Sequence, residues 1–186
     1  MPFLSALENS DQGLARFFLR GKCMAGNTAE LLDILRAVLT AHNFNDKERF
    51  RQIVLEHKSE LETAMVPRGH SAVISRLKAQ FNEAHWAAEQ MGGIEALFFI
   101  RRLAEEMEQD WDTVCTRLKT VHEKLMHRNN IVINVTVDSA TLPGVLQSVE
   151  SFISSLGSTG GFMPKAWIPT SLPRSEALTA PTRVNY

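Results

Sequence analysis

The chain has 186 residues, of which 44% are hydrophobic and 22% are charged, and its 20 basic and 21 acidic residues give a formal net charge of −1. This balance is typical of a globular protein with one domain, or with one domain and a fragment of a second. The near-zero charge argues against binding to nucleic acid or to an anionic membrane, because it provides no positive field to attract either.

The cysteine count and the apolar runs limit the compartment. Cys23 and Cys115 are far apart in the sequence, which favours a reducing compartment over a disulfide framework. No apolar run approaches the roughly 20 residues of a membrane-spanning helix. The N-terminus includes Glu8 and Asp11 and resembles neither a secretory signal nor a transit peptide. We expect residues 1–13 to be poorly structured.

Hydrophobic periodicity predicts a strand and two helices after this segment. Residues 15–24 alternate between apolar and polar side chains, which is typical of a strand with one exposed face. Asn27 and Glu30 have the spacing of a capping box and begin a predicted helix that fades near residue 42. A similar start at residue 45 begins a second predicted helix, which continues to about residue 66. The two predicted buried stripes are Leu31, Ile34, Leu35 and Val38, and Phe50, Ile53, Val54, Leu61 and Met65.

The stretch 67–93 is bounded by Pro67 and Gly69 at one end and by Gly92 and Gly93 at the other. Its apolar residues recur at steps of three and four, which predicts one amphipathic helix that packs on one side and meets water on the other. We expect the side in water to carry Arg76, Lys78, Asn82 and Glu89. We expect the packed side to consist of Val73, Leu77, Phe81, Ala84, Ala88 and Met91.

Three more helices and a second strand are predicted further along the chain. The run A-L-F-F-I within residues 95–108 predicts a helix that is buried on several sides. Asp110 is the predicted cap of the next helix, and residues 131–138 alternate cleanly as a strand does. Thr141 and Pro143 begin the last helix. Its predicted stripe is Val145, Val149, Phe152, Ile153 and Leu156.

The composition changes at residue 157. Residues 157–175 are rich in glycine, serine and proline, which predicts a linker, and residues 176–186 are expected to be the first strand of a following, missing domain. Residues 14–156 are then one non-catalytic domain. The order of its elements favours an α+β fold in which a helix-rich layer packs on a partial antiparallel sheet.

Neither of two zinc-like patterns is complete. His122 and Glu123 with His127 resemble the helix H-E-x-x-H, but a spacing of five residues turns the two imidazoles about 140° apart. Residues 56–57 resemble the end of H-x-x-E-H, but Ile53 occupies the first ligand position. We therefore expect surface histidines and not a metal site.

Other candidates have a structural interpretation beside the functional one. Cys115 lies two helical turns from His122, a spacing that suggests a thiol nucleophile and its base, but its apolar stripe favours a core cysteine. The glycine-rich residues 157–161 follow a helix, whereas a phosphate-binding loop precedes one. Arg68 and His70 are candidates for a substrate contact, with a solvated helix start as the alternative. Packing is the expected role of Trp86, Trp111 and Trp167.

Five stretches, taken in order, resemble a known family. They are G-K-C-M-A-G-N at 21–27, R-G-H-S-A-V-I-S-R-L at 68–77, A-E-Q-M-G-G-I at 88–94, N-I-V-I-N-V-T-V-D at 130–138 and P-T-R-V-N-Y at 181–186. From about residue 14 to residue 186 the chain resembles the presequence protease (falcilysin-like) branch of the pitrilysin-type inverted-zincin metallopeptidases. The resemblance implies a long protein of four related α/β domains in two halves, which close around a peptide chamber, with zinc bound in the first domain.

On that resemblance, this chain corresponds to most of the third domain and the beginning of the fourth. No family zinc ligand, general base or arginine–tyrosine pair matches a residue of this sequence. We therefore assign no catalytic or metal-binding residue, leave the substrate-binding residues unknown, and expect the chain alone to be inactive and to bind no zinc.

The resemblance implies a non-catalytic segment of a zinc metalloendopeptidase that degrades unfolded targeting peptides. The segment would form part of the chamber wall, in the mitochondrial matrix or the plastid stroma. Its partners would be the remaining domains of the parent protease and unfolded peptides, with no nucleic acid and no membrane. The alternatives are a stand-alone peptide-binding module, a small hydrolase that uses Cys115, and a truncated chain without a function of its own.

Overall fold

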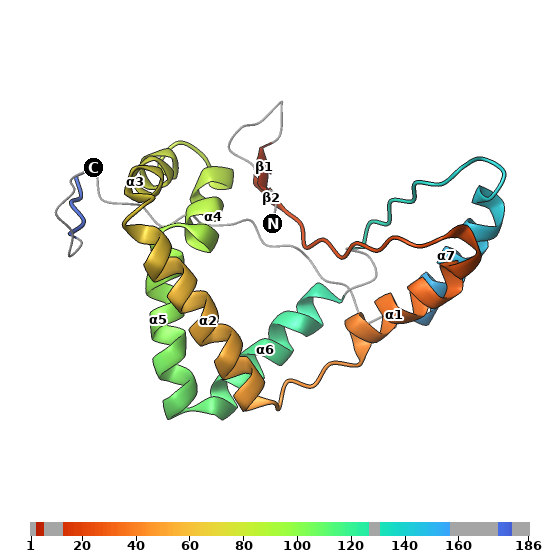
Figure 1. Ribbon diagram of the computed structural model, residues 1–186, viewed down its shortest axis with the longest axis horizontal. Coiled ribbons are helices and arrows are strands. Elements are labelled where there is room, and N and C mark those ends of the chain that lie inside the picture. The colour runs from red at the N-terminus through yellow and green to blue at the C-terminus, as the bar shows by residue number, and fades with distance from the viewer. Residues whose placement is uncertain (1–2, 6–12, 127–130, 157–174, 180–186) are drawn as a thin grey trace. The chain divides into compact units, whose positions relative to one another are not determined.

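The computed structural model describes residues 3–5, 13–126, 131–156 and 175–179. In these residues the regular structure is almost entirely helical, with seven α-helices, one short 3-10 helix and one pair of strands (Figure 1). The chain divides into two compact units, which are described separately. Unit 1 comprises Met1–Phe18, Lys47–Trp111 and Lys165–Tyr186, and unit 2 comprises Leu19–Asp46 and Asp112–Pro164.

Unit 1 is built on two long helices that lie side by side, α2 (Lys47–Met65) and α5 (Ile94–Gln109) (Figure 1). Two shorter helices, α3 (Gly69–Lys78) and α4 (Glu83–Gly92), pack on each other, and α4 also packs on α5. The strands β1 (Phe3–Ser5) and β2 (Gly13–Ala15) pair antiparallel beside α4. The apolar core of this unit contains Val54, Ala79, Ala84, Ala87, Ile94, Ala96, Leu97, Ile100 and Met107.

Unit 2 contains a second helical pair, α1 (Thr28–Thr40) and α7 (Leu142–Ser155), which pack on each other. The 3-10 helix η1 (Ala25–Asn27) precedes α1, and α6 (Trp111–Leu125) belongs to unit 2 from its second residue onward. Asp138 accepts hydrogen bonds from the hydroxyl and the N–H of Thr141 and from the N–H of Ala140, and these bonds lower the pKa of its carboxyl. The buried apolar residues are Val114, Cys115, Val145, Val149 and Leu156.

The prediction of an α+β fold with an antiparallel sheet is wrong. Residues 16–24 and 131–138 were expected to be strands, but among the described residues only the three-residue pair β1 and β2 forms a ladder. Alternating side chains fit a pleated strand, but a strand also needs hydrogen bonds to a neighbour, and no described segment pairs with either stretch. A helix satisfies its backbone groups internally, so the helices form without such a partner.

The stretch 67–93 forms two helices and not one. Asn82 ends the break between α3 and α4, and its side-chain oxygen caps α4 by accepting a 2.9 Å hydrogen bond from the N–H of His85. The predicted sides are also largely inverted. Glu89 is 0% exposed and Arg76 is 8% exposed, whereas Phe81 is 75% exposed, and Leu77 and Met91 are also exposed.

The other predicted helices are present, with boundaries close to those expected. The stripe of α7 is confirmed at Val145, Val149 and Leu156, which are buried. The prediction is wrong at three details: the side chain of Asn27 does not cap α1, Ile34 is exposed in α1, and Phe99 is exposed in α5.

The predicted linker lies almost wholly outside the described residues, and the division into residues 1–13, 14–156, 157–175 and 176–186 remains a prediction. Among the described helices, none has the length and apolar character that a membrane span requires.

Candidate functional site

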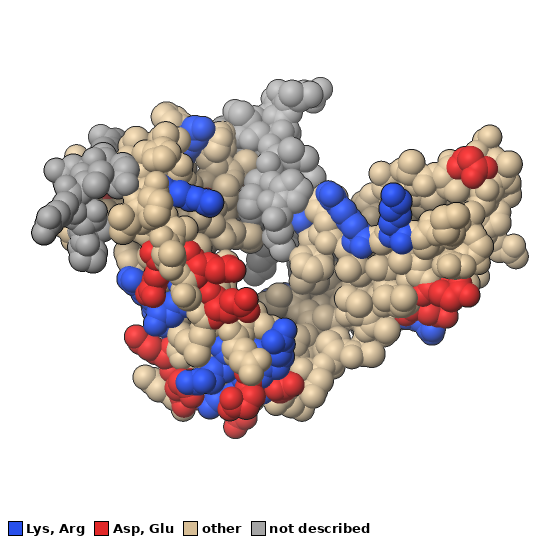
Figure 2. All heavy atoms as spheres, viewed as in Figure 1, with Lys and Arg blue, Asp and Glu red and all other residues tan. Residues whose placement is uncertain are grey.

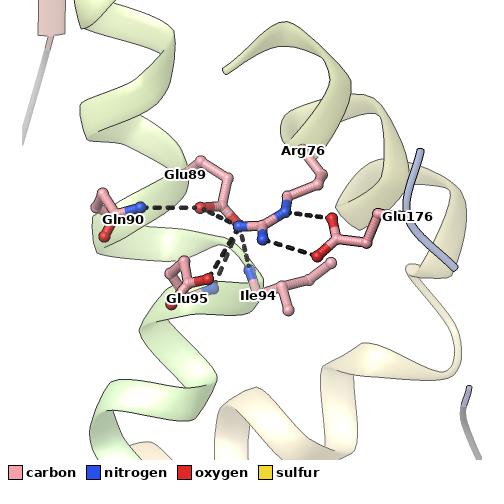
Figure 3. Close-up of polar contacts among 6 residues, drawn as sticks. All are labelled: Arg76, Glu89, Gln90, Ile94, Glu95 and Glu176. Atoms are coloured by element: carbon pink, nitrogen blue, oxygen red, sulfur yellow. Dashed lines mark hydrogen bonds and ion pairs between the residues drawn. The ribbon is translucent and has the colours of Figure 1, made fainter. Parts of the chain in front are cut away.

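A buried ion cluster in unit 1 is centred on Arg76, near the C-terminal end of α3 (Figure 3). Its guanidinium group contacts the carboxylates of Glu89 in α4, Glu95 in α5 and Glu176 in the segment 175–179. Nη1 lies 3.1 Å from Glu95 Oε1 and 3.2 Å from Glu89 Oε2. Nε and Nη2 donate to the two carboxylate oxygens of Glu176 at 2.8 and 2.9 Å. One cation therefore joins four segments of the chain.

Glu89 connects this cluster to the beginning of α5. Its Oε1 accepts hydrogen bonds from the N–H groups of Ile94 at 2.9 Å and Glu95 at 3.2 Å, while Oε2 faces Arg76 (Figure 3). The first N–H groups of a helix have no partner within the helix, and the helix dipole favours a negative charge beside them. Glu89 therefore satisfies the start of α5 and balances the charge of Arg76 at the same time.

Gly93 makes the close approach between α4 and α5 possible. A Cβ atom added at this residue would lie 2.8 Å from the carbonyl oxygen of Glu89 and 2.9 Å from its Cγ. Contacts this short do not occur for real Cβ atoms, and the backbone oxygen cannot move aside as a flexible side chain would. The neighbouring Gly92 has open space around the same position. Of the two adjacent glycines, only Gly93 is therefore required by its surroundings.

The electrostatics of the cluster are consistent with a permanently charged structure. Hydrogen bonding to Glu176 and the neighbouring charge of Glu89 raise the pKa of Arg76, although burial opposes the shift. The hydrogen bond from Arg76 lowers the pKa of Glu176. Burying a charge is costly unless the charge is paired. The arrangement fixes the positions of α3, α4 and α5, and it supplies neither a nucleophile nor a general base.

Unit 2 has a separate histidine pair at the end of α1. The rings of His42 and His122 are stacked with their centroids 3.8 Å apart, and the ring of Phe44 lies 4.2 Å from that of His42. His122 Nε2 is 2.8 Å from the carbonyl oxygen of Leu39. Burial and the charge of His122 lower the pKa of His42. These rings help to line a depression of about 360 Å³ with Asn43, Asn45, Lys119 and Glu123.

The interpretation of Cys115 as a core residue is confirmed by its burial. Its side chain is 5% exposed, and its thiol donates to the carbonyl oxygen of Phe44 at 3.3 Å and to Asn45 Oδ1 at 3.4 Å. Neither acceptor is a base that could generate a thiolate. The geometry therefore gives no support to a hydrolase that uses this cysteine.

The remaining predicted sites do not assemble. His57 is exposed, with Nδ1 3.4 Å from Glu60 Oε2, and His127 lies outside the described residues. No three His, Cys, Asp or Glu side chains within the described part of the chain are arranged to hold a metal ion. With Ile53 in the first ligand position, the described residues do not fit the zinc ion that the resemblance implies for the full-length family.

Two further groups of predicted residues have a place in the fold but no demonstrated role in binding. Arg68 and His70 are exposed at the start of α3, and their contact with a substrate remains a prediction. The Trp111 ring packs 5.5 Å from that of Phe50, and Trp167 is outside the described residues.

The sequence reasoning missed every member of the Arg76 cluster. It placed Arg76 and Glu89 in water because charged residues on an amphipathic helix normally face solvent. The available signal was the glycine pair directly after Glu89. A glutamate in the last turn of one helix, followed by glycine and the start of another, indicates a side chain that caps the second helix.

The described chain is thus a set of helices held by a buried ion cluster, with no assembled catalytic group, and similarity to known proteins identifies its family. A family described as associated with peptidases of family M16, subfamily C, matches residues 3–103. The chain is 32% identical over 187 residues to presequence protease 1, chloroplastic/mitochondrial, of Arabidopsis thaliana. It is 22% identical over 156 residues to the mitochondrial presequence protease of Danio rerio.

The chain therefore belongs to this peptidase-associated family. The family match includes Arg76, Glu89 and Glu95, whereas Glu176 lies beyond it. The similarity covers 100% of this chain but 17% of the Arabidopsis protein, and 84% of this chain but 15% of the Danio protein. The chain thus spans about a sixth of the length of these relatives, and the resemblance to presequence proteases is confirmed.

Proposed function

We propose that this chain is a non-catalytic segment of a longer presequence-protease-like zinc metalloendopeptidase that degrades unfolded targeting peptides. The alignment over the whole chain with a protein about six times its length supports this proposal. The names of the relatives favour the mitochondrial matrix or the plastid stroma as its location. In this proposal, zinc and the catalytic groups belong to other domains, and this segment contributes to the wall of the peptide chamber.

The observation that carries the proposal is an exposed apolar stripe on α3, continued just after the helix. Val73, Ile74, Leu77 and Phe81 follow one another at helical spacing, and each is exposed by more than a third. In Figure 2 the visible surface over α3 and α4 is mostly uncharged, whereas acidic and basic side chains alternate over α2 and α5. Contiguous apolar patches on a protein surface usually mark a site of interaction.

The ion cluster gives this stripe a firm support. Arg76 precedes Leu77 in α3, and its bonds to Glu89 and Glu95 connect α3 to α4 and α5. A helix that is held on its buried side can present its outer side in one orientation, which reduces the entropy lost when a partner binds. The same feature suits a wall element that contacts another domain of the parent protease.

A chimaera tests this proposal. The aligned segment of the Arabidopsis relative is replaced by this chain, and cleavage of a quenched, unstructured peptide is measured with and without a zinc chelator. We expect the chimaera to cleave the peptide in a chelator-sensitive manner and this chain alone to show no cleavage. A folded but inactive chimaera, or cleavage by the purified chain alone, would contradict the proposal.

Variants of the stripe make the test specific. Leu77→Asp together with Phe81→Asp should lower the activity of the chimaera, because charge in an apolar contact must be desolvated. Leu146→Asp is the matched control, since Leu146 is an exposed apolar residue of α7 in unit 2. Equal activity of both variants would show that the stripe has no special role.

The second candidate is a stand-alone peptide-binding module, which the stretch 131–138 favours. These residues alternate in character, and no described strand pairs with them. An extended peptide could add to such a stretch through main-chain hydrogen bonds. Fluorescence anisotropy of a labelled unstructured peptide distinguishes the candidates: binding to the chain alone that Val135→Pro weakens supports the module, and absence of binding removes it.

A further inference from the structure

Glu176 is held by a bond geometry that is specific to arginine and a carboxylate. Nε and Nη2 of Arg76 donate to Oε2 and Oε1 of Glu176 at 2.8 and 2.9 Å, so that the planar fork of the guanidinium meets both oxygens (Figure 3). Such bidentate charged pairs are stronger and more directional than single neutral hydrogen bonds. The two residues are 100 positions apart in the sequence, so this contact is tertiary.

The position of Arg76 does not depend on Glu176. Its third nitrogen, Nη1, is held by Glu89 and Glu95, and Glu89 is held in turn by the N–H groups at the start of α5. Two carboxylates and two helices therefore orient the guanidinium and leave its Nε and Nη2 edge for a third carboxylate. The cluster is a socket whose base is complete within α3, α4 and α5.

The segment around Glu176 is attached mainly through this side chain. Residues 175–179 are all exposed, including the apolar Leu178, which is 46% exposed. The Glu176 side chain, at 26%, is less exposed than that of Leu178. Apolar burial therefore contributes little to the attachment, and the ion pair with Arg76 supplies most of it.

We propose that Arg76 forms a socket for a carboxylate carried on an extended segment, and that Glu176 docks in it to fasten the chain after residue 174 to unit 1. The attachment follows from unit 1 alone. In the longer protease of the proposed function, the docked segment would also give the following domain a fixed starting point, and that consequence rests on the proposed function.

Spin-label distances in the full 186-residue chain test the docking. One nitroxide is placed at Leu178→Cys and one at Glu105→Cys, on the exposed side of α5, in a Cys23→Ser background; Cys115 is buried and does not compete for the label. We expect a narrow distance distribution in the parent chain. Glu176→Gln keeps the size of the side chain and removes its charge, and should lower the ratio of docked to undocked chain by about tenfold or more.

The controls separate docking from folding. Arg76→Gln should give the same broad distribution as Glu176→Gln, while the exposed pair Arg101–Glu62 provides a matched control in Glu62→Gln, which should leave the distribution narrow. Glu176→Gln leaves Arg76 with two carboxylates, so its circular dichroism and thermal transition should match the parent chain.

A broad distribution in the parent chain, or a narrow one in Glu176→Gln, would overturn the socket. Neither result bears on the peptide cleavage of the chimaera, so failure of the socket and failure of the proposed function are distinguishable.

Discussion

Helix α7 and the helix pair α3–α4 show opposite relations between sequence pattern and burial. In α7 the periodic apolar residues Val145 and Val149 are buried. In α3–α4 the periodic apolar residues Leu77 and Phe81 are exposed, and the charged Glu89 is buried instead. Periodicity identifies the apolar side of a helix, but it does not identify which side the rest of the protein covers. A chain that is part of a longer protein can leave the apolar side uncovered.

The largest effect is expected at Glu89, which tests whether charge really supports α3–α4. Glu89→Ala should destabilise unit 1 by about 3–5 kcal/mol, because it leaves Arg76 short of a carboxylate and the first N–H groups of α5 without an acceptor. Urea denaturation followed by tryptophan fluorescence, which reports on Trp86 and Trp111 of unit 1, measures the change.

Two variants control this prediction. Glu62→Ala removes an exposed ion pair with Arg101 and should cost less than about 1 kcal/mol. Glu89→Gln keeps an acceptor for the N–H groups of α5 and should fall between the other two variants. If Glu89→Ala cost no more than Glu62→Ala, the cluster would not be a principal support of unit 1.

The second prediction concerns the close approach of α4 and α5. Gly93→Ala should destabilise unit 1 by about 1–3 kcal/mol, since the new Cβ would meet the backbone oxygen of Glu89. Gly92→Ala is the matched control, because it meets open space at the end of a helix, where alanine is favoured over glycine. The same urea experiment compares them, and equal stability of the two variants would contradict the close approach.

The third prediction tests the contrasting case, in which apolar burial follows the pattern. Val149→Ala should destabilise unit 2 by about 1–2 kcal/mol, because it opens a cavity between α7 and its neighbours. Leu146→Ala, at an exposed position of the same helix, should have little effect. Hydrogen exchange of the α1 and α7 amides measures both changes, and comparable protection in the two variants would argue against the observed face of α7.

The smallest effect is expected at the histidine pair of unit 2. Burial and the charge of His122 lower the pKa of His42 below 6.5, so the folded chain binds a proton there less readily than the unfolded chain does. The stabilising contribution is therefore present above pH 6.5 and is lost as the pH falls through the lowered pKa.

NMR titration of the His42 ring tests this sign. His122→Asn should raise the pKa of His42 only in part, because burial, the larger cause, remains. A His42 pKa above its ordinary value in the parent chain would contradict the prediction.

Sequence alone determined most of the helices. α1, α2, α5, α6 and α7 lie close to their predicted ranges, since helix starts, breaks and apolar periodicity are local properties that a helix satisfies internally. The family was also accessible, because long stretches in a consistent order are specific in a way that short motifs are not. The absence of a complete zinc pattern could be read from the residues themselves.

Only the tertiary structure decided which residues meet. The strands predicted at 16–24 and 131–138 depended on hydrogen-bond partners that no described segment supplies. The burial of Arg76 depended on Glu89, Glu95 and Glu176, the last of which lies 100 residues away along the chain. A charge is stable inside a protein only when its partners are brought to it, and periodicity along one helix contains no information about partners on others.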